Sequence, residues 1–235
     1  MDITWLGHSC FRLHDADMTV VTDPYPAAVG LRVDNRPAEI VTISNPHPNH
    51  ANAEGIDGDP KVFSNPGEYE FNGVTARGVM TPLAEGQPQE ERNVAFTVEI
   101  GGINICHLGD ISTPLTTRII DELKPVDVVL VPVGGHCTFD MGQVYQTLQD
   151  LDAKIAIPMH YKTDSINVDV DPIDNFVRRM GLDEIQAQPR LVVTSTNLGT
   201  DMRVVVMTSQ GRPREKPVSL NLGRLSTQNR FPQLP

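Results

Sequence analysis

Apolar residues in the first hundred positions come in short runs of strand length, separated by polar turns. Asn72-Gly73 and Gly101-Gly102 are dipeptides that close β-hairpins between such runs, and Asp15-Ala16-Asp17 joins another pair. This half of the chain is therefore predicted to be β-structure. The predicted strands are Met1–Leu6, Cys10–Leu13, Met18–Thr22, Glu39–Ser44, Lys61–Phe63, Glu68–Phe71, Val74–Val79, Asn93–Ile100 and Ile103–His107.

The second half of the chain alternates between helical and strand patterns. Leu115, Ile119 and Leu123 recur at helical spacing, and Asp140 with Gln143 makes a capping box ahead of a second apolar helical face. Helices are predicted to begin after Thr113-Pro114, Asp140 and Asp171-Pro172, and strands are predicted at Val126–Val133, Lys154–Met159, Arg190–Thr194 and Met202–Thr208.

Strands followed by alternating helices and strands predict a mixed sheet system with helices on its outer faces. No internal repeat or linker interrupts residues 1–210, so we expect a single domain there. Residues 211–235 carry several prolines and no clear period, which predicts a tail that is extended on the surface or disordered.

The composition limits the kinds of partner and the cellular compartment that we expect for this protein. The 235 residues carry a formal net charge of −11, so nucleic acid is not an expected partner, because a phosphate backbone needs clustered Lys and Arg. The longest apolar runs have strand length, far below the roughly 20 residues of a membrane span, so no membrane partner is expected. Three cysteines without a CxxC pair, and no visible secretory signal, indicate the cytoplasm.

Histidines and an aspartate follow several of the predicted strands. His47 and His50 come directly after Glu39–Ser44, while Asp110 and His160 follow later buried strands. Imidazoles and carboxylates on loops at strand ends are a common way to assemble a metal site in α/β enzymes.

The order of the motifs resembles that of the metallo-β-lactamase superfamily, and in particular the branch that contains ascorbate-6-phosphate lactonase and small bacterial Zn-dependent hydrolases. The resemblance implies the α/β (α+β) class and a four-layer αββα sandwich, in which two mixed β-sheets are flanked by helices. The matching segments are Thr4–Cys10, Val21–Pro24, Cys106–Asp110, Val131–Gly135 and Ile157–Tyr161.

The chain departs from the metal signature of that family. The signature His-x-His-x-Asp-His falls on residues 45–50, which read Asn-Pro-His-Pro-Asn-His, so Asn45 and Asn49 replace two ligands. A further family histidine would fall at Pro82–Leu83, and no histidine lies between His50 and His107. The resemblance therefore implies a degenerate site.

Counting the remaining ligands leads to one ion at most. The resemblance implies two metal positions. The first would be held by residue 45, His47 and the absent histidine, of which only His47 remains, and we expect His47 to lie beside the metal and contribute little. The second would be held by residue 49 and by His50, Asp110 and His160, and these last three donors are enough for a zinc ion with room for water. We expect one zinc, or manganese in its place, or no ion, at His50, Asp110 and His160.

Asp110 and Asn49 are the predicted catalytic residues. A neutral amide at Asn49 lacks the charge that offsets the desolvation of a divalent cation, so only weak hydrolysis is expected.

Further residues are expected to contact the substrate or to hold the ligands in place, again from the resemblance. They are His8, Asp23, His107 and His136. Asp23 would accept a hydrogen bond from a ligand histidine, and His136 could supply an imidazole in place of a lost one. Lys162 and Thr163 would either receive a substrate phosphate or form a solvated loop.

Two classes of function stay open. The first is a metal-dependent hydrolase with a small-molecule substrate, namely an ester, a lactone or a phosphorylated compound. The second is a non-catalytic relative that binds a ligand or a protein through the degenerate pocket. No phosphate-binding GK[ST] loop and no GxSxG elbow is present, which argues against nucleotide and serine-hydrolase chemistry. Homo-oligomerisation is open as well.

Overall fold

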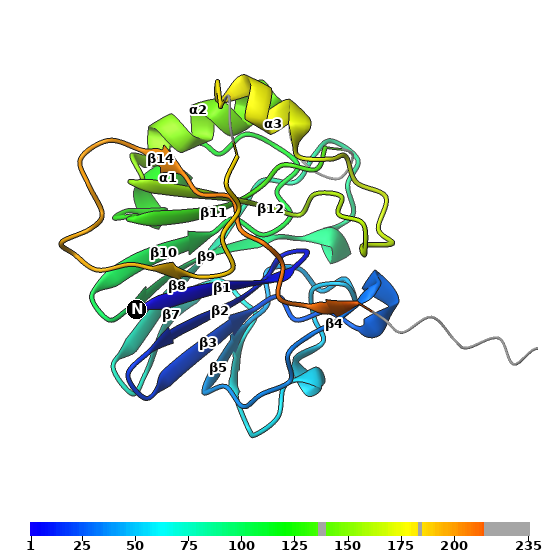
Figure 1. The fold of residues 1–235 in the computed structure, drawn as a ribbon, viewed down its shortest axis with the longest axis vertical. Helices are drawn as coiled ribbons and strands as arrows, with labels where there is room; N and C mark the ends of the chain where they lie inside the picture. The colour runs from blue at the N-terminus through cyan, green and yellow to red at the C-terminus, as the bar shows by residue number, and fades with distance from the viewer. Residues whose placement is uncertain (136–139, 183–184, 214–235) are drawn as a thin grey trace, which may run out of the picture.

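Two β-sheets pack face to face in the computed structural model, which describes residues 1–135, 140–182 and 185–213 (Figure 1). The N-terminal sheet has the order β13-β1-β2-β3-β5-β6, and the C-terminal sheet has the order β14-β12-β11-β10-β9-β8-β7. The strands of the N-terminal sheet are β1 (Asp2–Gly7), β2 (Cys10–Asp15), β3 (Met18–Thr22), β5 (Ile40–Thr42), β6 (Lys61–Phe63) and β13 (Leu191–Val192). Those of the C-terminal sheet are β7 (Gly67–Phe71), β8 (Val74–Met80), β9 (Val94–Ile100), β10 (Ile103–His107), β11 (Val128–Pro132), β12 (Ile155–Met159) and β14 (Arg203–Val204).

The alternation of side chains along the strands separates two apolar clusters. Trp5 and Phe11 belong to the main core, together with side chains of the C-terminal sheet such as Phe96. Leu6 and Cys10, each one position away along its strand, belong to a second cluster. Complete burial of a large apolar side chain contributes about 1.5–3 kcal/mol, so both clusters stabilise the sandwich.

The α-helices cover the C-terminal sheet. They are α1 (Thr117–Leu123), which contacts β8 and β9, α2 (Met141–Leu151) and α3 (Asp174–Arg179), and α2 and α3 lie side by side (Figure 1). The two-sheet α/β sandwich is confirmed.

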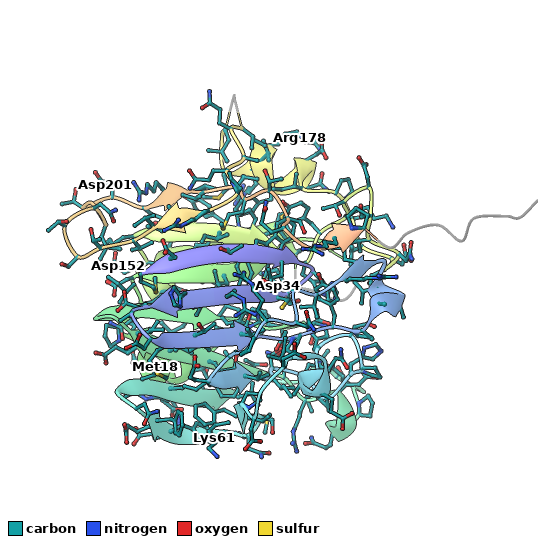
Figure 2. All side chains as sticks on the ribbon, turned by 60° about the horizontal axis from the view of Figure 1, so that its bottom comes forward. Met18, Asp34, Lys61, Asp152, Arg178 and Asp201 are labelled. Carbon is teal, nitrogen blue, oxygen red and sulfur yellow. The ribbon has the colours of Figure 1, made fainter. Side chains whose placement is uncertain are left out.

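The outer layer over the N-terminal sheet differs from the predicted helical one. Within the described ranges, the second apolar cluster is covered by loops and short 3-10 turns, η1 (Ala27–Val29) and η2 (Ala53–Gly55). Buried Arg12 fastens one of these loops by donating hydrogen bonds to the carbonyl oxygens of Asp34, Arg36 and Pro37. Figure 2 looks onto this side of the molecule, where the loop that carries Asp34 lies over the strands.

Two predicted helix starts are wrong. The first helix begins at Thr117 and is capped by Thr116, whose Oγ accepts a hydrogen bond from the Ile119 amide. Thr113 instead donates its hydroxyl proton to the Pro82 carbonyl, so a tertiary contact uses the side chain that local sequence assigned to the cap. The third helix starts only at Asp174. The capping box of α2 is confirmed.

The structure describes only the first residues of the predicted tail. Among these, β15 (Arg212–Pro213) pairs with β4 (Leu31–Arg32) in an antiparallel ladder. No helix among the described residues has the length and apolar character needed to cross a membrane.

The direction of the strands explains where the site lies. β3, β5 and β6 run parallel, as do β10, β11 and β12. β1 leads away from the labelled N-terminus, and the segments after β1, β5, β10 and β12 meet at the opposite edge of the sandwich (Figure 1). Carboxyl ends of parallel strands are the usual location of α/β ligand sites.

Candidate metal centre

Three imidazoles and one carboxylate converge at this edge. His8 follows β1, His50 follows β5, Asp110 follows β10 and His160 follows β12. The ligand nitrogens of His8, His50 and His160 all lie within 4.8 Å of one another. The four side chains therefore come from four separate segments and both sheets.

Asp110 lies beside two of these imidazoles. Its Oδ2 is 3.9 Å from His50 Nε2, and its Oδ1 is 4.0 Å from His160 Nδ1. Two donors that each sit about 2.0–2.2 Å from one ion are roughly 3–4 Å apart. Each of these two pairs is thus at a distance that ligands of one ion can have, although His50 and His160 lie near different oxygens of Asp110. The described group whose donor atoms all lie within 4.8 Å of one another is His8, His50 and His160, without Asp110.

Several atoms of this cluster have no hydrogen-bond partner in the described structure. They are four buried atoms, namely Nδ1 and Nε2 of His8, Nδ1 of His160 and Oδ1 of Asp110. A buried polar atom left unpaired costs about 1–3 kcal/mol, and unpaired atoms of this kind are uncommon. Imidazole nitrogens and a carboxylate oxygen are ligands that zinc accepts, so the residues present fit the group that the family implies.

Asp23 orients His50. Its Oδ2 accepts a hydrogen bond of 2.9 Å from His50 Nδ1, and the carboxylate also accepts from the amide (2.7 Å) and the hydroxyl (2.5 Å) of Ser44. Burial disfavours the charged carboxylate, but His107, His50 and Ser44 together hold the pKa of Asp23 below its ordinary value. The Nε2 of His50 is left facing the cluster, as the role predicted for Asp23 requires.

The backbone around Asp110 leaves little freedom. The amide of Asp110 donates to Asn93 Oδ1 at 2.8 Å, and Asn93 Nδ2 donates to the Leu108 carbonyl at 2.9 Å. Gly109 has φ +68°, and a Cβ there would lie 2.1 Å from Asn93 Oδ1. Only glycine fits this position, which fixes the direction of the next side chain.

His8 and His160 are tied to each other through the main chain. The amide of His160 donates to the His8 carbonyl at 3.0 Å, and Trp5 Nε1 donates to the same oxygen at 3.0 Å. Both histidines have a left-handed backbone, with φ values of 51° and 53°. Burial lowers the pKa of His160 to about 4 and that of His8 well below its ordinary value, so both rings are neutral at pH 7.

The predicted neighbours His47, Asn45 and Asn49 line the same cavity but play different parts. His47 is exposed, and its Nδ1 accepts from the Asn49 amide at 3.2 Å. Asn45 Oδ1 closes a turn by accepting from the His47 amide at 2.7 Å. In the described part of the chain, no second group of three such side chains is close enough to share an ion.

His107 is buried behind the cluster. Its Nε2 lies 2.8 Å from the Ser9 carbonyl, its Nδ1 accepts from the Gly109 amide at 3.2 Å, and burial lowers its pKa. It therefore links the turn after β1 to the loop that carries Asp110. His136 lies outside the described residues.

The cavity in front of the cluster has a volume of about 490 Å³. Four further residues line it that the sequence did not indicate, namely Gln87, Glu91, Val168 and Asp169. Glu91 ends the 3-10 turn η3 (Gln89–Glu91) and the other three lie in loops. None of them belongs to a motif, so no local signal marks them. Lys162, for which a phosphate contact and a solvated loop were both open, donates from Nζ to the Val168 carbonyl at 3.1 Å.

Comparison with known proteins identifies the family. The family model of the β-lactamase superfamily domain matches residues 2–160. A UPF0173 metal-dependent hydrolase of Carboxydothermus hydrogenoformans is 28% identical over 216 residues, which cover 77% of this chain and 94% of that protein. Another from Archaeoglobus fulgidus is 26% identical over 217 residues, which cover 78% and 93%.

A solved structure extends the comparison to three dimensions. The Thermotoga maritima protein, assigned as a Zn-dependent hydrolase of the metallo-β-lactamase superfamily, is 35% identical with a TM-score of 0.73, covering 88% of this chain and 97% of that one. The chain therefore belongs to the metallo-β-lactamase superfamily. Within the superfamily it is similar to the UPF0173 proteins.

Proposed function

We propose that this protein is a metal-dependent hydrolase that binds one divalent ion through His50, Asp110 and His160. The observation that carries the proposal is the convergence of these side chains: Asp110 lies 3.9 Å from His50 Nε2 and 4.0 Å from His160 Nδ1, and the second of these contacts joins two buried atoms that have no hydrogen bond. Its relatives are metal-dependent hydrolases, which supports the same class. Zinc suits a donor set dominated by imidazole, and manganese is the alternative.

A bound divalent ion would supply Lewis acidity and lower the pKa of a water molecule. Asp110 would hold the ion, and the Asn49 amide would orient the substrate or a water in the cavity that both residues line. Because Asn49 is uncharged, it cannot take up a proton as a carboxylate would, and we propose that hydrolysis is weak.

The charge of the cavity favours a neutral substrate over a phosphorylated one. Among the described lining residues, Glu91, Asp110 and Asp169 are carboxylates, and none is Lys or Arg. Apart from the proposed ion, a phosphate group would meet these carboxylates and no positively charged side chain among the described lining residues. We therefore propose a small neutral ester or lactone as the substrate.

Metal analysis tests the proposal. Protein purified without chelator and then saturated with zinc or manganese should hold one ion per chain, and His160→Ala should abolish uptake while His47→Ala retains it. Hydrolysis of neutral esters and lactones should exceed that of matched phosphate esters. No ion at saturating metal would overturn the proposal in favour of a non-catalytic binding protein, and two ions per chain would overturn the single site.

The proposal places the reaction in the cytoplasm, with a small molecule and not a nucleic acid as the partner. Cys10 and Cys106 are buried free thiols, which supports a reducing compartment. The net charge of −11 supports the absence of a nucleic-acid partner.

A further inference from the structure

His8 occupies an environment that its predicted role as a substrate contact or structural residue does not explain. Its exposed fraction is 1%, and neither ring nitrogen has a hydrogen-bond partner in the described structure. A structural imidazole buried to this extent normally bonds through at least one nitrogen. The nearby phenol of Tyr25 is not that partner, because it donates to the Leu6 carbonyl at 2.5 Å.

The ring of His8 is instead surrounded by the proposed ligands. Its centroid lies 4.3 Å from that of His160 and 4.8 Å from that of His50. A neutral imidazole carries one N–H donor and one bare acceptor nitrogen, yet no hydrogen bond joins the His8 ring to either neighbour in the described structure. A divalent cation is a partner that can bind one bare nitrogen from each of the three rings at once.

The backbone holds His8 in this place. Its carbonyl receives hydrogen bonds from Trp5 Nε1 and from the His160 amide, both at 3.0 Å. The left-handed φ of 51° is unfavourable by about 1 kcal/mol or more for a residue of this size. The fold thus fixes an unfavourable conformation that turns this imidazole toward His50 and His160.

We propose that His8 is a fourth ligand of the ion bound by His50, Asp110 and His160. The inference rests on the proposed function in that it requires an ion at this site. The family signature has a carboxylate ligand at the position of Asn49. His8 takes the place of this missing ligand. The resulting set of three neutral imidazoles and one carboxylate leaves a divalent ion with a net charge of +1, and hence strongly polarising.

Proton NMR of the Co²⁺-loaded protein tests this assignment directly, because each coordinated imidazole gives a strongly shifted, exchangeable N–H signal. The wild-type protein should show three such signals, and His8→Asn should show two. Asparagine is chosen because it tolerates the left-handed conformation. Zinc affinity, measured by chelator competition, should fall by roughly 10- to 100-fold in His8→Asn. His14→Asn, at an exposed histidine away from the cluster, is the matched control and should leave both readouts unchanged.

The outcomes separate the two proposals. Two shifted signals in the wild-type protein, or zinc affinity within threefold of wild type in a folded His8→Asn, would overturn the role of His8 and leave the metal site standing. Failure of the wild-type protein to take up Co²⁺ or Zn²⁺ would overturn both. If His8→Asn does not fold, the number of shifted N–H signals in the wild-type protein alone shows whether three or two imidazoles bind the ion.

Discussion

Asn49 and Asn45 stand at ligand positions of the family signature, but the structure treats them differently. Asn49 lines the cavity beside His50 and Asp110. Asn45 has its side-chain oxygen committed to the His47 amide at 2.7 Å. Restoring a ligand at each position should therefore have unequal effects.

Asn49→Asp should tighten zinc binding by roughly fivefold, because an ionised ligand contributes about 1 kcal/mol more than a neutral one. Asn45→His should leave the stoichiometry at one ion, since the described residues offer no further donors for a second site. Chelator competition and elemental analysis measure the two quantities. A second ion in Asn45→His, or unchanged affinity in Asn49→Asp, would contradict this account.

Asp23 is expected to affect metal binding through His50, whose ring it orients. Asp23→Asn keeps the shape but removes the charge that accepts from His50 Nδ1. Zinc affinity should fall by roughly 10- to 100-fold, the usual effect of losing such a partner. Asp34→Asn is the control, because Asp34 accepts from Arg36 far from the cluster. Equal affinities in the two variants would show that Asp23 does not position His50.

Some residues of this candidate site can be predicted from sequence motifs, whereas others are placed by contacts between distant parts of the chain. His50, Asp110 and His160 could be predicted because each follows a strand in a family motif, and their distances are consistent with that expectation. The place of His8 could not, because it depends on a left-handed turn and on a hydrogen bond to a residue 152 positions away. Glu91 and Asp169 reach the cavity through long-range packing of loops.

The elements are predictable where local sequence determines them. The hairpins at Asn72-Gly73 and Gly101-Gly102 and the capping box of α2 are confirmed. The start of α1 is not predictable in the same way, because both Thr113 and Thr116 are good caps and a distant carbonyl engages the first. Tertiary contacts therefore decide between locally equivalent signals.

Gly109, in the loop after β10, allows a matched test of how this segment positions Asp110. Gly109→Ala should lower the free energy of unfolding by about 2–4 kcal/mol and weaken metal binding, because the new Cβ would overlap Asn93 and Ser44 at a positive φ. Gly102→Ala has a similar φ of +71° but no atom within 4 Å, so it should destabilise by only about 1 kcal/mol and leave metal binding intact. Denaturant titration and zinc competition of both variants give the comparison. Equal losses would mean that backbone strain alone matters.

The two halves of the chain meet at the edge of the sandwich where the site lies. His8 and His50 belong to the half of the chain that forms the N-terminal sheet, and Asp110 and His160 belong to the other half. Main-chain hydrogen bonds such as Val94 N to Ser44 O join the two halves there. An ion held by all four side chains would cross-link the halves, and metal binding should add to the stability of the entire sandwich.

The buried histidines at this edge should make the metal-free protein sensitive to acid. Burial lowers the pKa of His8, His107 and His160, the last to about 4, whereas the contact with Asp23 raises that of His50. A histidine whose folded pKa is lowered binds a proton more readily when unfolded, so its contribution is present above about pH 6.5 and is lost as the pH falls toward 4. His50 acts in the opposite direction, and the large shift of His160 is the basis of the expected net effect.

The free energy of unfolding of the chelator-treated protein should therefore decrease between pH 6.5 and 4. His160 alone accounts for about 3 kcal/mol of the decrease, from a pKa shift from 6.5 to about 4 in a fully buried group. Urea titrations at several pH values measure it, and His160→Gln is the reference, because subtracting its pH dependence removes the effect of the surface charges. Parallel curves for the two proteins would show that His160 is not held neutral by burial. The ring would then titrate near the ordinary histidine pKa of about 6.5, and metal affinity would begin to fall below that pH, because the proton competes with the ion.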